Sequence, residues 1–112
     1  MAAVAYLDID QGSDFTAEMT LEGDTGVAMN LTGFQVYSQF RKSFGSTIGH
    51  SFTTSIVDAT TGVITLSLSG TYSSGIRPGR YLYDVEIVNT DGRKTRVVEG
   101  IVTINPEITK IP

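Results

Sequence analysis

Paired carboxylates are the residues of this sequence whose types and spacing could most readily do chemistry. Asp84 and Glu86 alternate along the chain, and glycoside hydrolysis requires two carboxyl groups. Asp8 and Asp10 form an Asp-x-Asp pair, which resembles half of a calcium-binding loop. A complete calcium loop needs more oxygen ligands and a bidentate Glu, and acids that alternate with apolar residues are typical of the solvent side of an antiparallel strand. We therefore expect solvated acids at both places, with no metal site and no catalytic pair.

Other catalytic arrangements find little support. His50 is the only histidine and the chain has no cysteine, so a multi-histidine metal site and a thiol site are excluded. The sequence contains no phosphate-binding loop, nucleophile elbow or His-Glu zinc motif. The basic cluster of Arg93, Lys94 and Arg96 is small and lacks interleaved aromatic residues, and the net charge is −4. The sequence therefore predicts a protein that is not an enzyme and that binds no cofactor and no nucleic acid.

The last third of the chain predicts one long β-hairpin over residues 78–104. Asp91-Gly92 supplies the turn, because this pair tolerates the positive φ angles that match strand twist. The second strand is apolar on both faces, so either Gly100 marks a bulge that switches the inward face or one apolar row meets a partner. The first strand carries apolar residues at every second position, the period of a strand with one buried face: Tyr81, Tyr83, Val85 and Ile87.

Short strands separated by turn signals predict the rest of the fold. We expect strands at residues 4–10, 13–21, 34–42, 52–56 and 63–69, a short extended piece at 27–31, a flexible loop at 43–49 and a connection at 70–77 with room for a single helical turn. Such spacing favours an all-β, immunoglobulin-like antiparallel β-sandwich of about seven strands, with a small barrel of the OB type as the alternative. The residues expected to be buried between the sheets are Phe15, Phe34, Val36, Ile64, Leu66, Tyr81, Tyr83 and Val85.

The 112 residues are expected to form one sandwich over 1–104, followed by an extended tail over 105–112. Apolar runs are strand-sized and the N-terminus lacks a signal-peptide pattern, which predicts a soluble protein with no membrane partner. The N-terminus is small, apolar and uncharged, and the proline-containing tail keeps two isoleucines, so both segments suit a contact better than a free end. We therefore expect partner binding at Ala2, Val4, Tyr6, Ile108 and Ile111.

Charge is distributed unevenly along the chain. Six acids and no base precede Arg41, while the remainder carries eight bases and six acids. Solvated strand faces and turns are one explanation of this asymmetry. The other is a pair of complementary patches by which copies, or a neighbouring protein, dock side by side.

The order and spacing of short motifs resemble those of small immunoglobulin-like structural proteins of tailed bacteriophages, and of the N-terminal sandwich of siphophage baseplate upper proteins. Asn30-Leu31-Thr32-Gly33-Phe34 and Pro78-Gly79-Arg80-Tyr81 lie among the segments that carry this resemblance, which are residues 10–15, 30–34, 41–43, 61–68, 78–86 and 98–107.

The resemblance covers nearly the whole chain and implies a virion protein present in many copies. A capsid decoration, or cement, protein is the expected function, with a neck, tail or baseplate component as a close alternative. Its implied partners are major capsid, neck or tail proteins and further copies of itself. A host-surface or carbohydrate-binding module is a third reading, for which exposed aromatic platforms at Tyr6, Tyr37 and Tyr72 would be the distinguishing feature.

Overall fold

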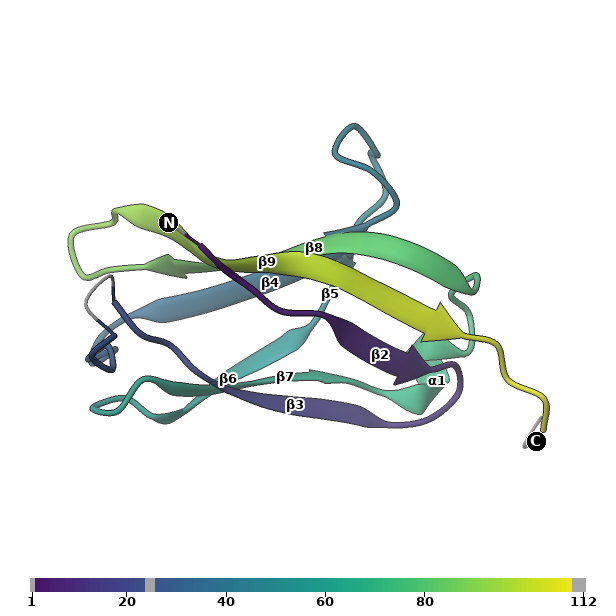
Figure 1. Cartoon of the computed structure of the whole chain (residues 1–112), viewed down its shortest axis with the longest axis horizontal. Helices are drawn as coiled ribbons and strands as arrows, with labels where there is room; N and C mark the ends of the chain where they lie inside the picture. The colour runs from purple at the N-terminus through teal and green to yellow at the C-terminus, as the bar shows by residue number, and fades with distance from the viewer. Residues whose placement is uncertain (1, 24–25, 110–112) are drawn as a thin grey trace.

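A computed structural model describes residues 2–23 and 26–109. Two β-sheets are packed face to face, as Figure 1 shows. Within the described residues the elements are, in chain order, β1 (Ala3–Val4), β2 (Leu7–Asp10), β3 (Phe15–Thr20), β4 (Gln35–Arg41), β5 (His50–Ser51), β6 (Thr53–Asp58), β7 (Val63–Leu68), α1 (Gly70–Ser73), β8 (Gly79–Val88) and β9 (Lys94–Asn105).

The first sheet, sheet A, has the strand order β1-β9-β8-β4-β5, and β2 also pairs with β9. The second, sheet B, has the order β3-β7-β6. β1 and β2 run parallel to β9, while the other pairs are antiparallel. The expected all-β, immunoglobulin-like antiparallel β-sandwich is thus confirmed, and so are the long C-terminal hairpin and the helical turn after β7.

The core lies between the two sheets and follows the alternation of the strands. β7 and β8 place every second side chain inward. Six of the eight residues expected in the core are buried, whereas Phe15 and Phe34 are partly buried against it. Buried polar groups are paired: the Ser38 hydroxyl, for example, donates to the Asp84 carbonyl oxygen at 2.6 Å. In the described part of the chain, no buried side-chain nitrogen or oxygen lacks a hydrogen-bond partner.

The N-terminal strand departs from the expectation of one strand over residues 4–10, because it is broken into β1 and β2 at Ala5 and Tyr6. At the break, the Ala5 carbonyl oxygen occupies the space that a Cβ at Gly100 would fill. The Tyr83 hydroxyl donates a hydrogen bond to this oxygen at 2.8 Å. A glycine on β9 and a tyrosine on β8 therefore create the break, which leaves Tyr6 directed outward.

A β-bulge in the hairpin lies three residues before the expected position. Val98 pairs with Val85 and Arg96 pairs with Glu86, so Val97 is the extra residue. The expectation of a bulge at Gly100 is wrong, since Gly100 pairs regularly with Tyr83. Val97 is partly buried against the core, whereas Ile101 of the same row stays on the outer face, so the bulge brings only part of that row inward.

Two further segments differ from the expectation. The extended piece expected at 27–31 contributes only an isolated bridge between Glu22 and Ala28. The short strand β5 was not expected, and the chain passes from sheet A to sheet B at Phe52, whose amide donates to the Ser38 carbonyl oxygen at 3.0 Å. The loop between β4 and β5 rises away from sheet A in Figure 1.

Among the described residues, no helix has the length and apolar character needed to cross a bilayer.

Candidate partner-binding site

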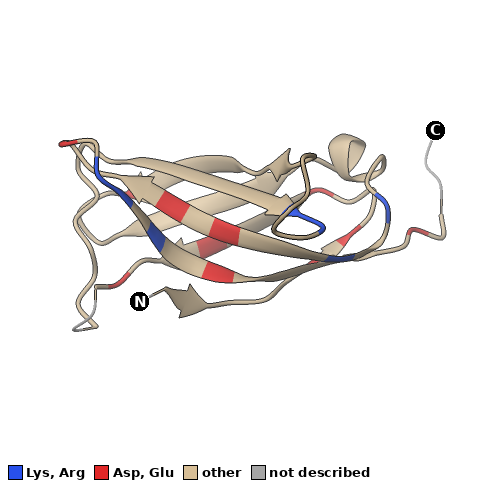
Figure 2. Cartoon of the chain, turned by 90° about the horizontal axis from the view of Figure 1, so that it is seen from above, with Lys and Arg blue, Asp and Glu red and all other residues tan. Residues whose placement is uncertain are grey.

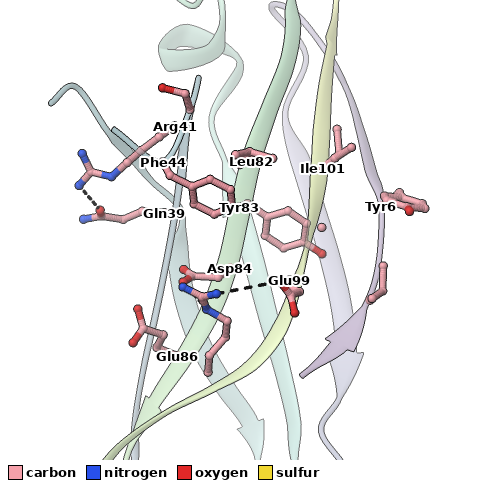
Figure 3. Close-up of a pocket in the computed structure, with 14 residues that line it drawn as sticks. Tyr6, Gln39, Arg41, Phe44, Leu82, Tyr83, Asp84, Glu86, Glu99 and Ile101 are labelled. Carbon is pink, nitrogen blue, oxygen red and sulfur yellow. Dashed lines mark hydrogen bonds and ion pairs between the residues drawn. The ribbon is translucent and has the colours of Figure 1, made fainter. Parts of the chain in front are cut away.

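A groove of about 480 Å³ lies on the outer face of sheet A. Leu82 of β8 and Ile101 of β9 form its apolar floor (Figure 3). Phe44 of the β4–β5 loop and Tyr6 of the β1–β2 break stand on opposite sides of this floor. We refer to this hollow as the groove.

Strand alternation places the floor of the groove, Leu82 and Ile101, on the outer face of sheet A. Tyr81, Tyr83 and Val85 point into the core, so the residues between them on β8 face outward. Leu82 and Ile101 pair directly across β8 and β9, and both are only partly buried. Two adjacent aliphatic side chains on an outer sheet face form an apolar surface suited to a partner.

The N-terminal side of the groove is held rigidly. The Ala5 amide donates to the Glu99 carbonyl oxygen at 3.0 Å, and the Tyr83 hydroxyl bonds the Ala5 carbonyl oxygen at 2.8 Å. Val4 and Tyr6, which flank Ala5, remain 64% and 72% exposed. Both apolar side chains are thus displayed from an ordered backbone, which lowers the entropy that a partner must remove on binding.

The opposite side is formed by Phe44, which is 84% exposed at the tip of the β4–β5 loop. The loop makes a turn in which the Ser46 amide donates to the Ser43 carbonyl oxygen at 3.1 Å. Arg41 braces this turn by donating from Nη1 to the Ser46 carbonyl oxygen at 3.0 Å and from Nη2 to Gln39 Oε1 at 2.9 Å. The loop therefore presents Phe44 by means of specific hydrogen bonds, although its Gly and Ser content had suggested a flexible segment.

Charged side chains close one end of the groove. Arg96 Nε lies 3.1 Å from Asp84 Oδ2, and Arg96 Nη1 lies 4.0 Å from Glu99 Oε2. Exposed pairs of this kind contribute about 0.2–1 kcal/mol, so they orient the side chains more than they stabilise the fold. The side chain of Glu86, next along the face, makes no ion pair or hydrogen bond with the other described residues. Figure 2 shows acidic residues along the middle of neighbouring strands, with basic residues nearer the strand ends.

The predicted partner-binding residues separate into two places. Val4 and Tyr6 line the groove, whereas Ala2 precedes β1 and does not line it. Ile108 is 95% exposed beyond the end of β9, away from the groove, and Ile111 lies outside the described residues. Sequence reasoning missed Phe44 as a site residue, although a large apolar residue in a polar loop is the kind of signal that could have identified it.

Residues considered for chemistry adopt structural roles. His50 Nδ1 lies 2.8 Å from the Tyr72 hydroxyl, and burial lowers the pKa of His50. Asp8 and Asp10 are exposed on β2, and Asn105 Nδ2 donates to Asp10 Oδ1 at 3.3 Å. Within residues 2–23 and 26–109, no group of three His, Cys, Asp or Glu side chains is placed to hold a metal ion.

The similarities to known proteins are similarities of backbone structure. No protein family model and no curated protein matches the sequence. An internalin-like protein of Listeria monocytogenes is similar with 18% identity and a TM-score of 0.47, over 93% of this chain and 28% of that one. CopC from Methylosinus trichosporium OB3b has 12% identity and a TM-score of 0.46, over 98% of this chain and 91% of that one. AggA, the major subunit of aggregative adherence fimbriae type I of Escherichia coli, has 14% identity and a TM-score of 0.42, over 93% of this chain and 91% of that one.

Proposed function

We propose that this chain is a non-enzymatic structural protein of a bacteriophage virion, most specifically a capsid decoration protein that binds other virion proteins in many copies. The resemblance of its motif order to small immunoglobulin-like phage proteins supports the virion assignment. The outer face of sheet A supports the mode of action, since it displays exposed apolar side chains on both sides of a groove. That display is the observation on which the proposal rests.

Three apolar side chains around the groove are exposed to solvent. Val4, Tyr6 and Phe44 are 64%, 72% and 84% exposed. Burying a side chain of this size contributes roughly 1.5–3 kcal/mol. Aromatic anchors on rigid backbone commonly dominate protein interfaces. Two aromatic anchors and a valine around one groove therefore supply a substantial part of the free energy that docking onto a protein partner requires.

Electron microscopy of purified particles tests the proposal directly. Antibodies raised against the purified chain and carried on gold are applied to phage particles from the source that encodes it. Label distributed over the capsid is the expected result. Label confined to the neck, tail or baseplate would favour the alternative placement in the virion, and particles without any label would contradict a virion role.

A binding assay with matched variants tests the site. Tyr6→Ser and Phe44→Ser remove the two aromatic anchors and should each weaken binding of the chain to purified particles at least about tenfold, since each anchor contributes more than 1.4 kcal/mol. Val57→Ser is the control, because Val57 is 57% exposed on β6 of the other sheet. Equal losses for all three variants would show that the groove is not the contact.

A host-surface or carbohydrate-binding module is the second candidate. Tyr6 favours it, because this 72% exposed ring lines the same groove as carboxylates that could bind hydroxyl groups. The other two aromatic candidates do not line the groove. Tyr37 is on β4, where its hydroxyl donates a hydrogen bond to Gln35 Oε1, and Tyr72 is on α1, where its hydroxyl is hydrogen-bonded with His50. Binding of the purified chain to immobilised host glycans, lost in Tyr6→Ser, would support this candidate over the first.

A further inference from the structure

We propose that the groove receives the segment Ile108-Thr109-Lys110-Ile111-Pro112 of a second copy of this chain. This inference rests on the proposed function in taking the groove as the binding site, and it adds the identity of the occupant. Copies would then be linked on the particle surface through the tail of one and the outer face of the next.

The structure presents the start of this segment from a fixed point. The Glu107 amide donates to Gln11 Oε1 at 3.0 Å. Gln11 is itself fixed by two hydrogen bonds. Its backbone N–H donates to the Asn105 carbonyl oxygen at 2.9 Å, and its side-chain Nε2 donates to the Ile76 carbonyl oxygen at 2.9 Å. The next residue, Ile108, is 95% exposed. An aliphatic side chain displayed from a hydrogen-bonded anchor is suited to a contact with another molecule.

The groove of the same copy does not receive this side chain. Ile101, on the groove floor, lies four residues before Asn105 on β9, which is about 13 Å along the strand. After β9 the chain turns to Gln11, and Figure 1 shows it leaving the sandwich at the end opposite the β8–β9 turn. Because Ile108 is 95% exposed, it is not seated in the groove of its own copy, and an occupant that includes Ile108 comes from another copy.

The chemistry of the groove matches that of the segment. The floor of Leu82 and Ile101 suits the two isoleucines of the segment. Glu86, which makes no ion pair among the described residues, suits its single cation, Lys110. The groove floor lies on the face of two paired strands and not at a sheet edge, so the segment is expected to dock through side chains and not as an added strand.

A face-to-face pairing of two sheets A fits less well. Asp84, Glu86 and Glu99 all line the groove on this face (Figure 3), so two copies packed with their grooves together would bring like charges together. A tail-to-groove contact instead joins two different surfaces. Such a contact closes a ring or a reciprocal dimer where the geometry allows, and otherwise continues from copy to copy.

A charge-swap cycle tests the occupant. Sedimentation velocity of the whole chain over a range of concentrations gives the association constant of wild type, Glu86→Lys, Lys110→Glu and the double variant. Each single variant should weaken association on the order of tenfold, and the double variant should recover wild-type association to within about twofold. Val27→Lys, at a 67% exposed site that does not line the groove, should leave association unchanged.

Other results would overturn the inference. A wild-type chain that stays monomeric at millimolar concentration excludes the contact, and so does a double variant that associates as weakly as the singles. The particle-binding assay separates this failure from failure of the proposed function. If Tyr6→Ser and Phe44→Ser lose particle binding while Lys110→Glu and Ile108→Ser retain it, the groove is the virion contact and the tail is not its occupant.

Discussion

Gly100→Ala should detach the first strand from sheet A while leaving the sandwich folded. Gly100 does not have a positive φ angle, so the substitution meets no conformational penalty of its own. Its added methyl group instead overlaps the Ala5 carbonyl oxygen, a backbone atom that can move only with the strand. The consequence is local, because β8 and β9 pair along their length without help from β1.

The size of the effect follows from the contacts that Ala5 makes. Displacing it breaks the hydrogen bond from the Tyr83 hydroxyl, at 2.8 Å, and the bond from the Ala5 amide to Glu99, at 3.0 Å. A net contribution of about 0.5–1.5 kcal/mol for each bond gives a loss of about 1–3 kcal/mol in the free energy of unfolding. Overpacking a well-filled site typically costs the same amount, about 1–3 kcal/mol.

Urea denaturation followed by tyrosine fluorescence measures this loss, and hydrogen exchange locates it at the Ala5 amide. Gly23→Ala is the control, because the added methyl group would lie an ordinary 3.9 Å from its nearest neighbour among the described residues and the φ angle of Gly23 is not positive. Binding to particles should fall together with the protection of Ala5, since Val4 and Tyr6 lose their fixed positions. An unchanged urea midpoint with unchanged protection of Ala5 would contradict the predicted detachment of the first strand.

Three further predictions concern the core and its titratable groups. Leu66→Ala, at a side chain with 0% exposure, should lower the free energy of unfolding by about 2–5 kcal/mol in the same urea assay. Burial raises the pKa of Tyr83 to about 12. The stability linked to this shift is therefore complete below about pH 10 and is lost as the pH rises through the folded pKa. Tyr83→Phe should remove the last step of a tyrosinate absorbance titration. Burial lowers the pKa of His50 from 6.5. The stability linked to this shift is therefore complete above pH 6.5 and is lost as the pH falls through the folded pKa. In thermal melts, the melting temperature of His50→Gln should depend less on pH between about pH 7 and pH 5 than that of the wild type.

Local patterns were sufficient to predict most of the sandwich. The hairpin of β8 and β9 follows from alternating apolar residues and an Asp-Gly turn, both of which act over a few residues. The break in the N-terminal strand could not be predicted in this way. It depends on Gly100 and Tyr83, which meet Ala5 only after the chain has folded, and no periodicity links such distant positions.

The candidate site was predictable only in part for the same reason. Val4 and Tyr6 stand out in the sequence as apolar residues near an uncharged end, and both line the groove. Phe44 reaches the groove because Arg41 braces its loop through hydrogen bonds whose geometry the sequence does not reveal. A base after the hairpin turn pairs across the strands with Asp84, through Arg96, but strand alternation alone does not specify that Asp84 and not Glu86 is the partner.

Site-specific photo-cross-linking on assembled particles tests directly whether the outer face of sheet A is the contact with the virion. Tyr6 and, separately, Val57 are replaced by p-benzoylphenylalanine, and the irradiated particles are analysed by mass spectrometry. Because Tyr6 lines the groove and Val57 lies on β6 of sheet B, we expect a cross-link to a capsid protein or to a second copy from the first position and none from the second. Cross-links from Val57 with none from Tyr6 would contradict the account.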